Sequence, residues 1–228
     1  MTVVVITPIE EERNSLAEAL EDLGLAGREH RIGRLEGMSY SDERVLLVKG
    51  GLGKVQFAVH TQHVLDQLPG VEVLICAGVA GALSDTLSIG DVVVATSAVE
   101  HDFNWKANQD SPPSFEGHSS YLSALGGLRL EDPSLGLHFG PIASGDEAIL
   151  DERRAGELHQ TTGALAVAWE GAGGARAAAF SDVPYLEVRA ISDRADDQAA
   201  SVWLENVPSA MRSVAVVLDK LVEHVTTR

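Results

Sequence analysis

The sequence predicts an α/β protein in which helices cover both faces of a parallel or mixed sheet. Short apolar runs recur along the chain, for example at residues 71–77 and 184–193, and they favour buried strands. Helical patterns separate most of these runs, and chains that alternate in this way bury their strands between layers of helices. With 228 residues, of which 45% are hydrophobic, the chain can form one large core. We therefore expect a single domain over residues 1–228.

In the N-terminal half, apolar runs alternate with segments that carry helix-start signals. The expected elements are a strand at residues 2–7, a helix at 10–23, strands around 29–36 and 44–49, a helix at 54–68, a strand at 71–77 and a turn at 78–81. Pro8 precedes the first helix, and acids in the first helical turn suit the positive end of the helix dipole. Gly50, Gly51 and Gly53 mark the start of the second helix.

The C-terminal half continues the alternation after one polar interruption. The expected elements are a strand at 91–99, a loop at 104–117, a short helix at 119–125, a strand at 137–143, a helix at 151–159, a strand at 164–168, a helix at 170–179, a strand at 184–193 and a helix at 203–225. Pro112 and Pro113 favour a mobile loop in the polar stretch. The helix at 170–179 is rich in small residues, so we expect it to pack closely against the sheet or a partner.

Charge and cysteine content exclude several classes of function. The formal net charge of −17 repels phosphate backbones and anionic lipids, so we expect a small-molecule ligand, no nucleic acid and no membrane partner. Cys76 is the only cysteine and lies in an apolar run, so nothing indicates an oxidising compartment. The apolar run at residues 3–6 is too short for a membrane span and lacks the flanks of a signal peptide. The expected location is the cytoplasm.

The glycine-rich segments do not match nucleotide-binding motifs. Val48 and Val55 stand where a P-loop at residues 50–54 needs Gly and Ser or Thr. Either close backbone approach to a ligand or the start of a helix explains these glycines. At residues 77–81, Cys76 takes the place of the first glycine of a dinucleotide fingerprint, and no long helix follows. No nicotinamide cofactor is expected.

Metal and acyl-transfer chemistry are also disfavoured. His60 and His63 lie three residues apart on a helix, but no third ligand is spaced to join them, so we expect a packed or solvated pair and no metal. The sequence contains no Gly-x-Ser-x-Gly segment, and Cys76 is expected to belong to the core.

Acidic residues follow the ends of several expected strands. These residues are Glu12, Asp146, Glu170 and Asp193. Each can be explained as a helix N-cap or first-turn acid, and of the three glutamates at 10–12 only one can face the crevice, because successive helical residues are rotated by about 100°. Ligands of open α/β sheets bind beyond the carboxyl ends of the strands. Four acids on this side of the sheet therefore indicate a site for chemistry.

Eight short segments follow one another in a specific order along nearly the whole chain. They are PIEEE at 8–12, GLGKV at 51–55, AGVAGAL at 77–83, IGDVVV at 89–94, HD at 101–102, SGD at 144–146, WEG at 169–171 and VRAISD at 188–193. Their order and spacing resemble the nucleoside phosphorylase and nucleosidase superfamily, and most closely the bacterial 5′-methylthioadenosine/S-adenosylhomocysteine nucleosidases. The resemblance implies a three-layer α/β/α sandwich with a central twisted mixed sheet, no cofactor and a homodimer.

The resemblance also implies roles for individual side chains in cleaving an N-glycosidic bond. Glu12 would orient and deprotonate the attacking water, and Arg189 would help to hold it. Glu170 would accept the ribose hydroxyls, and Asp193, supported by Ser192, would protonate the departing purine. The remaining substrate-binding positions that it implies are Leu52, Gly78, Val79, Phe103, Ile149 and Trp169. At Ile149 the backbone would read the edge of the purine.

The chain departs from the nucleosidase pattern near these positions. Ala148 stands where the nucleosidases have a phenylalanine that stacks on the purine, and Val79 stands where they have a serine near the water. Ala168 stands in place of a second glutamate, and Trp169 stands in place of a methionine under the ribose. The missing aromatic face would cost about 1–3 kcal/mol of base binding, unless Phe103, Trp105 or Trp169 supplies another. In the hexameric phosphorylases, an arginine that binds phosphate stands at the position of Cys76, and its absence favours hydrolysis over phosphorolysis.

The leading hypothesis is a purine-nucleoside N-ribosyl hydrolase that acts on 5′-methylthioadenosine or S-adenosylhomocysteine without a metal or redox cofactor. A futalosine-type or other 5′-modified nucleoside hydrolase is an alternative that Ala148 favours, and a purine nucleoside phosphorylase is another. A non-catalytic nucleoside-binding protein is a third alternative, motivated by Val79, Ala148 and Ala168. We also expect the apolar side chains of the loop at 104–117 to close over the 5′ substituent or to cover a dimer seam.

Overall fold

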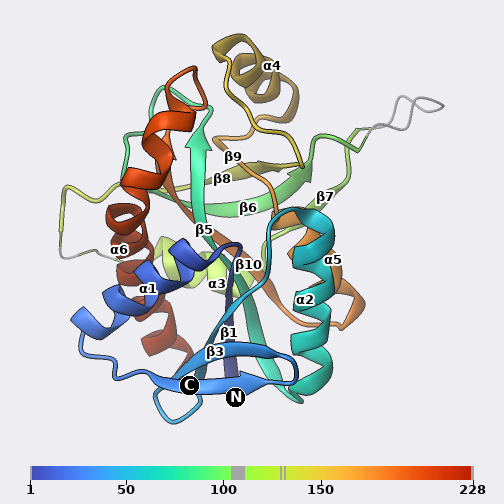
Figure 1. The fold of residues 1–228 in the computed structure, drawn as a ribbon. Coiled ribbons are helices and arrows are strands. Elements are labelled where there is room, and N and C mark those ends of the chain that lie inside the picture. The colour runs from blue at the N-terminus through green and yellow to red at the C-terminus, as the bar shows by residue number, and fades with distance from the viewer. Residues whose placement is uncertain (1, 104–110, 129, 131, 227–228) are drawn as a thin grey trace.

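The structure is a computed structural model that describes residues 2–103, 111–128, 130 and 132–226. One mixed sheet runs through it, with helices on both faces, which confirms the predicted fold class (Figure 1). The strands are β1 (Thr2–Thr7), β2 (Arg28–Ile32), β3 (Leu35–Tyr40), β4 (Val45–Lys49), β5 (Val71–Ala82), β6 (Val92–Glu100), β7 (Ser114–Glu116), β8 (Leu137–Ser144), β9 (Ala166–Ala168) and β10 (Tyr185–Asp193). The helices are α1 (Glu10–Asp22), α2 (Lys54–Gln67), α3 (Ser119–Gly126), α4 (Glu152–Thr162), α5 (Gly171–Phe180) and α6 (Ala199–Thr226).

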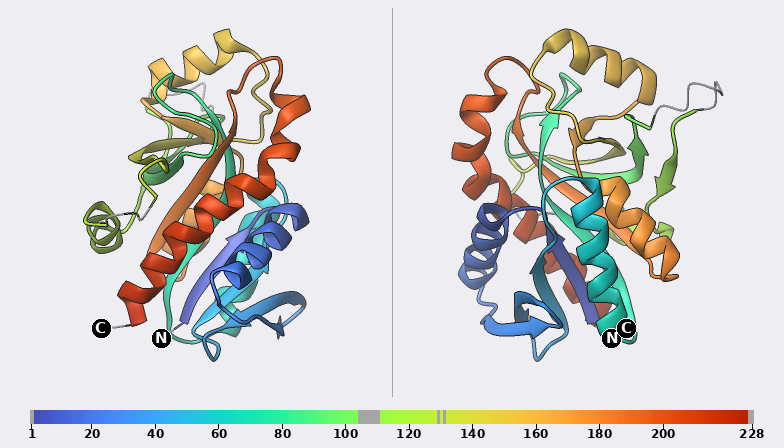
Figure 2. Two further views of the ribbon diagram at one scale, coloured as in Figure 1. Left: turned by 90° about the vertical axis from the view of Figure 1, so that its left-hand side faces the viewer. Right: turned by 45° about the vertical axis from the view of Figure 1, so that its right-hand side comes forward.

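The sheet is open at one end and curled at the other. β1 pairs in parallel with β4 and β5, and β3 and β2 extend the sheet beyond β4 in antiparallel order. β5 pairs with both β10 and β9, and the pairings of β10 with β6, β6 with β8, and β8 with β9 close a ring of strands. Helices α1 and α6 lie on one face of the sheet, and α2 and α5 lie on the other (Figure 2).

Burial on both faces explains why the strands are continuously apolar. In β1, Val3 and Val5 join the core under α1 and α6, whereas Val4 and Ile6 join the core that contains Phe57 of α2. Successive side chains of a strand point to opposite faces, so a strand between two helix layers needs apolar residues at every position. The same rule makes the polar residues of β10 conspicuous, because all nine residues of this strand are buried.

The turn expected at residues 78–81 is wrong, because β5 continues without interruption to Ala82. Arg189 of β10 pairs with Gly78, and Val167 of β9 pairs with Gly81. These pairs join residues that lie more than 80 positions apart in the sequence. Such pairing outweighs the local tendency of glycines to reverse the chain. These two glycines instead allow side chains of neighbouring strands to approach the backbone of β5.

Other differences concern boundaries. The single strand expected around residues 29–36 is a hairpin of β2 and β3, which turns at Gly33 with φ +56°. α6 begins at Ala199 rather than at 203, and β7 lies within the expected loop, of which residues 104–110 are outside the described residues. The helix rich in small residues packs closely against the sheet, as expected, since a Cβ on Gly171 would lie 2.1 Å from Glu187 Oε2 of β10. It also packs against α2, where a Cβ on Gly173 would lie 2.4 Å from the Lys54 carbonyl oxygen. Among the described residues, we find no helix with the length and apolar character that a membrane crossing requires.

Candidate active site

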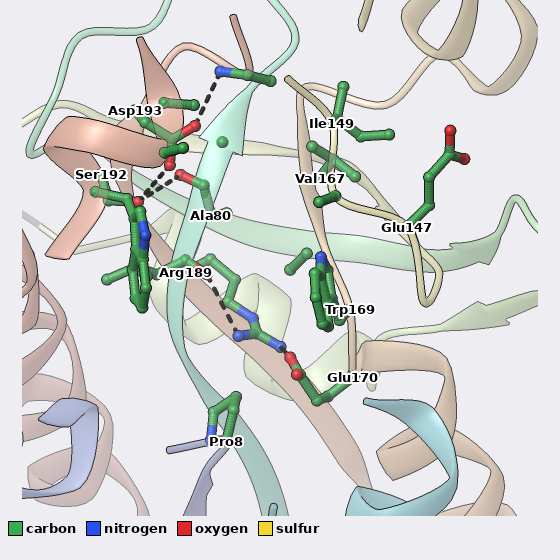
Figure 3. Close-up of a pocket in the computed structure, with 18 of the residues that line it drawn as sticks. Pro8, Ala80, Glu147, Ile149, Val167, Trp169, Glu170, Arg189, Ser192 and Asp193 are labelled. Carbon is green, nitrogen blue, oxygen red and sulfur yellow. Dashed lines mark hydrogen bonds and ion pairs between the residues drawn. The ribbon is translucent and has the colours of Figure 1, made fainter. Parts of the chain in front are cut away.

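A cavity of about 380 Å³ opens beyond the carboxyl ends of β1, β8, β9 and β10 (Figure 3). Most of the expected site residues line it, and these are Glu12, Leu52, Val79, Ile149, Trp169, Glu170, Arg189, Ser192 and Asp193. Glu12, Glu170 and Asp193 therefore share one cavity, as the resemblance implies. Of the acids that follow strands, Asp146 does not line it.

Glu12 is the buried acid at the start of α1. Its side chain is 2% exposed and accepts hydrogen bonds from the backbone N–H groups of Val79, at 2.8 Å, and Ile9, at 3.1 Å. Burial raises the pKa of Glu12 to about 7, because desolvation disfavours the charged carboxylate. Arg189 opposes this shift and Glu170 adds to it. A carboxyl group with a pKa near neutrality suits proton transfer at physiological pH.

Arg189 lies at the centre of a cluster of buried acids. It is 1% exposed, and Nη2 donates to Glu170 Oε2 at 3.2 Å while Nε donates to Glu187 Oε1 at 2.9 Å. Nη2 also lies 3.2 Å from Cys76 Sγ, and Nη1 donates to the Val79 carbonyl oxygen at 3.4 Å. The guanidinium group is thus fixed on several sides, as a group that orients a ligand or a water molecule needs to be.

Gly78 explains how Glu12 and Arg189 come together. A Cβ at this position would lie 2.6 Å from both Glu12 Oε1 and Arg189 Nη1. Gly78 does not itself line the cavity. Its role is to leave room for these two side chains, which a methyl group would push apart.

Asp193 occupies the other side of the cavity, at the end of β10. Its Oδ1 accepts the Ala195 backbone N–H at 2.9 Å, and its Oδ2 accepts the Ser192 hydroxyl at 2.8 Å. Figure 3 shows Ser192 and Asp193 together, across the cavity from Glu170 and Trp169. Gly81 permits the approach of Asp193, because a Cβ there would lie 2.8 Å from Asp193 Oδ1. Both carboxyl oxygens are therefore held in a defined orientation.

The walls between these acids are apolar. Ile149, Val167 and Trp169 face the cavity from one side, as Figure 3 shows, and Ile149 is 6% exposed. Ala148 and Leu150 also line the cavity, but both are exposed to solvent. The cavity thus combines a few fixed polar groups with broad apolar walls, which is typical of sites for small organic ligands.

The glycine segment before α2 starts the helix, which is one of the two purposes that its sequence left open; close approach of its backbone to a ligand stays a prediction. Gly53 forms the N-cap of α2 with φ +79°, and its backbone N–H donates to Glu170 Oε1 at 3.1 Å. The backbone N–H of Lys54 donates to Asp146 Oδ1 at 2.8 Å. Asp146 therefore satisfies the amino end of a helix, whereas Glu170 is fixed from both sides by Gly53 and Arg189.

Phe103 is not part of the cavity wall. It is 50% exposed, and its ring centroid lies 5.9 Å from the guanidinium carbon of Arg176. Phe115 also packs against Arg176, at 4.9 Å. Trp105 and the tip of the expected lid lie outside the described residues, so closure of the loop stays a prediction.

Several cavity residues escaped the sequence analysis. They are Pro8, Ile9, Glu147, Ala195, Ala199, Ala200 and Trp203. Ala199, Ala200 and Trp203 belong to the first turns of α6, and their spacing of three and four residues, which places them on one face of a helix, was the available signal. Glu147 carries a bidentate pair with Arg154 of α4, at 2.9 and 2.7 Å. It reaches the cavity because it directly follows Asp146 after β8.

The histidine pair of α2 is a packed pair in which His63 Nε2 accepts the backbone N–H of Arg34 at 3.0 Å. Within the described part of the chain, no group of three or more His, Cys, Asp or Glu side chains is placed to hold a metal ion. Cys76 is a free, buried thiol whose pKa is raised well above its ordinary value by burial.

Comparisons with known proteins find relatives that match nearly the whole chain. A curated relative from Exiguobacterium sp. (strain ATCC BAA-1283 / AT1b), a 5′-methylthioadenosine/S-adenosylhomocysteine nucleosidase, is 32% identical over 100% of this chain and 98% of its own length. The solved structure of the Helicobacter pylori enzyme of the same name, bound to butyl-thio-DADMe-Immucillin-A, superimposes with a TM-score of 0.85. It is 26% identical, and the match covers 98% of each chain.

A second kind of enzyme is also similar. The native structure of futalosine hydrolase of Helicobacter pylori strain 26695 has a TM-score of 0.82 and is 25% identical, with 98% of each chain covered. The family model described as "Phosphorylase superfamily" matches residues 2–226 of this chain. The chain belongs to the phosphorylase superfamily.

Proposed function

We propose that this chain is a hydrolase that cleaves the N-glycosidic bond of 5′-methylthioadenosine, S-adenosylhomocysteine or a related 5′-modified purine nucleoside. One observation carries the proposal: Glu12, Glu170 and Asp193 line a single cavity with Arg189. The names of the relatives support the same reaction. The continuous sheet supports a single domain over residues 1–228, and the buried, unpaired Cys76 agrees with a cytoplasmic location.

Glu12 acts as the general base. A water molecule attacks C1′ of the ribose and gives a proton to Glu12 as the new C–O bond forms. The pKa of about 7 supports this role, because near neutral pH a large fraction of Glu12 is ionised and still basic enough to accept the proton. The backbone N–H groups of Val79 and Ile9 hold the Glu12 carboxylate on the protein side, and Glu170, which is paired with Arg189, accepts the ribose hydroxyls.

Asp193 assists the leaving group. As the bond between C1′ and the purine breaks, its electron pair goes to the base, and Asp193 donates a proton to a ring nitrogen. The Ser192 hydroxyl and the Ala195 N–H keep the carboxyl group in one orientation. The transition state has the character of a ribosyl cation, which the surrounding carboxylates stabilise.

Water rather than phosphate is the second substrate. Among the described residues that line the cavity, Arg189 is the only lysine or arginine, and it is already paired with Glu170 and Glu187. A phosphate dianion beside Arg189 would meet the carboxyl groups of Glu12 and Glu170, while the charge of this single cation is already shared with two glutamates. This balance of charge favours a neutral nucleophile.

The test is to incubate the protein with a panel of purine nucleosides, with and without phosphate, and to identify the products by mass spectrometry. We expect free base and a free 5-modified ribose in phosphate-free buffer, at a rate that phosphate does not increase. Ribose 1-phosphate that forms only with phosphate would indicate a phosphorylase. Tight binding without release of base at any pH would indicate a nucleoside-binding protein.

A futalosine-type nucleoside is the second candidate substrate. Ala148 and Ala168 line the cavity with small side chains, and the similar futalosine hydrolase structure shows that this fold also serves that reaction. Competition between futalosine and 5′-methylthioadenosine in the same assay distinguishes the two substrates, because the preferred one has the higher kcat/KM.

We also propose a homodimer. Leu52, Val55 and Val59 are 54%, 75% and 60% exposed, and the two valines lie one turn apart on the same face of α2. Leu52 also lines the cavity, so a second copy on this face would complete its rim. Light scattering should report a dimer for the wild type and a monomer for Val55→Lys with Val59→Lys. Leu23→Lys, which alters an exposed leucine after α1, should leave the dimer intact.

A further inference from the structure

Glu187 is a buried acid to which the proposed reaction assigns no role. It lies in β10, two residues before Arg189, so both side chains project from the same face of the strand. Glu187 is 0% exposed and does not line the cavity. It contacts Arg189 from the side away from the ligand, with Oε1 accepting Nε–H at 2.9 Å.

The surroundings of Glu187 are shaped for a carboxylate. A Cβ on Gly171, the first residue of α5, would lie 2.1 Å from Glu187 Oε2, so the glycine leaves this space to the acid. The amino end of α5 places its positive dipole beside the carboxylate. Tyr185 lies two residues before Glu187 on the same face of β10, and its hydroxyl donates to the Gly171 carbonyl oxygen at 2.9 Å.

The second oxygen of Glu187 has no hydrogen-bond partner among the described residues. A buried acid with one free oxygen destabilises the fold, so its presence calls for a reason other than stability. Arg189 is held between two acids, Glu170 in the cavity wall and Glu187 outside it.

We propose that Glu187 is a positioning residue for the hydrolytic reaction: its carboxylate holds the guanidinium group of Arg189 from the side away from the cavity. The inference rests on the proposed function. It makes Glu187 responsible for two properties of Arg189. The hydrogen bond to Nε fixes the plane of the guanidinium, and the negative charge of Glu187 offsets part of the positive charge that Glu12 experiences.

The charged neighbours define the expected electrostatic effect. Glu187 interacts electrostatically with Arg189 and Glu170, and with the Cys76 thiol and the Tyr185 hydroxyl. Glu12 interacts with the same Arg189 and Glu170. Burial raises the pKa of Glu187, and Arg189 opposes this shift. If the charge of Glu187 is removed, Arg189 stabilises the ionised form of Glu12 more strongly, and the pKa of Glu12 falls.

Two substitutions separate the hydrogen bond from the charge. Glu187→Gln keeps an oxygen acceptor for Nε–H and removes the charge, whereas Glu187→Leu removes both. Val188→Ala serves as the matched control, because Val188 is also fully buried in β10 but faces the opposite core. The pKa of Glu12 is measured by carbon-13 NMR of labelled glutamate carboxyl groups, with Glu12→Gln to assign the resonance.

In Glu187→Gln, we expect the pKa of Glu12 to fall by about half a unit or more, with the acid limb of kcat/KM moving equally. In Glu187→Leu, kcat/KM should fall by about 30-fold or more, and Gln at the same position should restore most of it. Val188→Ala should lower the melting temperature and leave the Glu12 pKa unchanged. An unchanged pKa in Glu187→Gln, or wild-type kcat/KM in Glu187→Leu, would overturn the proposal. The NMR titration needs no substrate, so its result is independent of whether the protein hydrolyses any nucleoside.

Discussion

Replacing Glu12 by Gln should change how the stability of the protein depends on pH. The pKa of Glu12 is about 7 in the folded protein, against an ordinary value of 4.5. Between these values the folded state binds more protons than the unfolded state, so the wild type loses stability as the pH rises. From pH 5 to pH 8 this loss is about 2.5 kcal/mol, obtained by integrating the difference in bound protons. The Gln variant lacks the titrating group and should not show this loss.

The assay is thermal unfolding of both proteins at pH 5 and pH 8, at constant ionic strength. A change of about 1 kcal/mol shifts the midpoint of a chain of this size by about 2–4 °C. The melting temperature of the variant minus that of the wild type should therefore rise by about 5–10 °C from pH 5 to pH 8. Any constant cost of placing an amide beside the N–H groups of Ile9 and Val79 cancels in this difference. A midpoint difference that is equal at both pH values would refute the raised pKa.

The same geometry predicts three further results. Gly78→Ala should lower both kcat/KM and the melting temperature, because its Cβ would lie 2.6 Å from Glu12 Oε1 and Arg189 Nη1. The control is Gly156→Ala in α4, where a Cβ would have no atom within 4 Å, and this variant should be more stable than the wild type by about 0.5–1 kcal/mol. Similar behaviour of the two variants would contradict the packing argument. Asp193→Asn should lower kcat by about 10²–10⁴ while a stable nucleoside analogue still binds, and an equal loss of binding and turnover would argue against proton donation. Ala148→Phe should strengthen purine binding in calorimetry by about 1–3 kcal/mol, and unchanged affinity would mean that another side chain already stacks on the base.

The positions of the main acids could be predicted because their sequence signals are local. Glu12 follows a short apolar strand and Pro8, and Asp193 ends a strand that is buried throughout. Parallel strands bring such ends to one edge of the sheet, so the cavity followed from the order of the elements. Asp146 has the same local signal, but in the structure it caps the start of α2. The pattern alone does not distinguish these two uses of an acid.

Contacts between distant segments could not be predicted in this way. β5 continues past Gly78 because β10 pairs with it, and that pairing joins residues about 110 positions apart. Glu187 looks like an unexplained polar residue in a buried strand until its partner is known. Its spacing of two from Arg189 was the available signal, because alternate residues of a strand share a face. The place of Trp203 in the cavity wall likewise depends on how α6 packs against β10.

The most direct test of the account is a crystal structure of the protein with a purine nucleoside analogue that carries a cationic sugar mimic. The account predicts that the analogue occupies the cavity with its sugar hydroxyls on Glu170, its base against Asp193 and Ile149, and a water molecule between the anomeric position and Glu12. An analogue bound outside the cavity, or one bound there with Glu12 and Asp193 on the same side of the glycosidic bond, would contradict it.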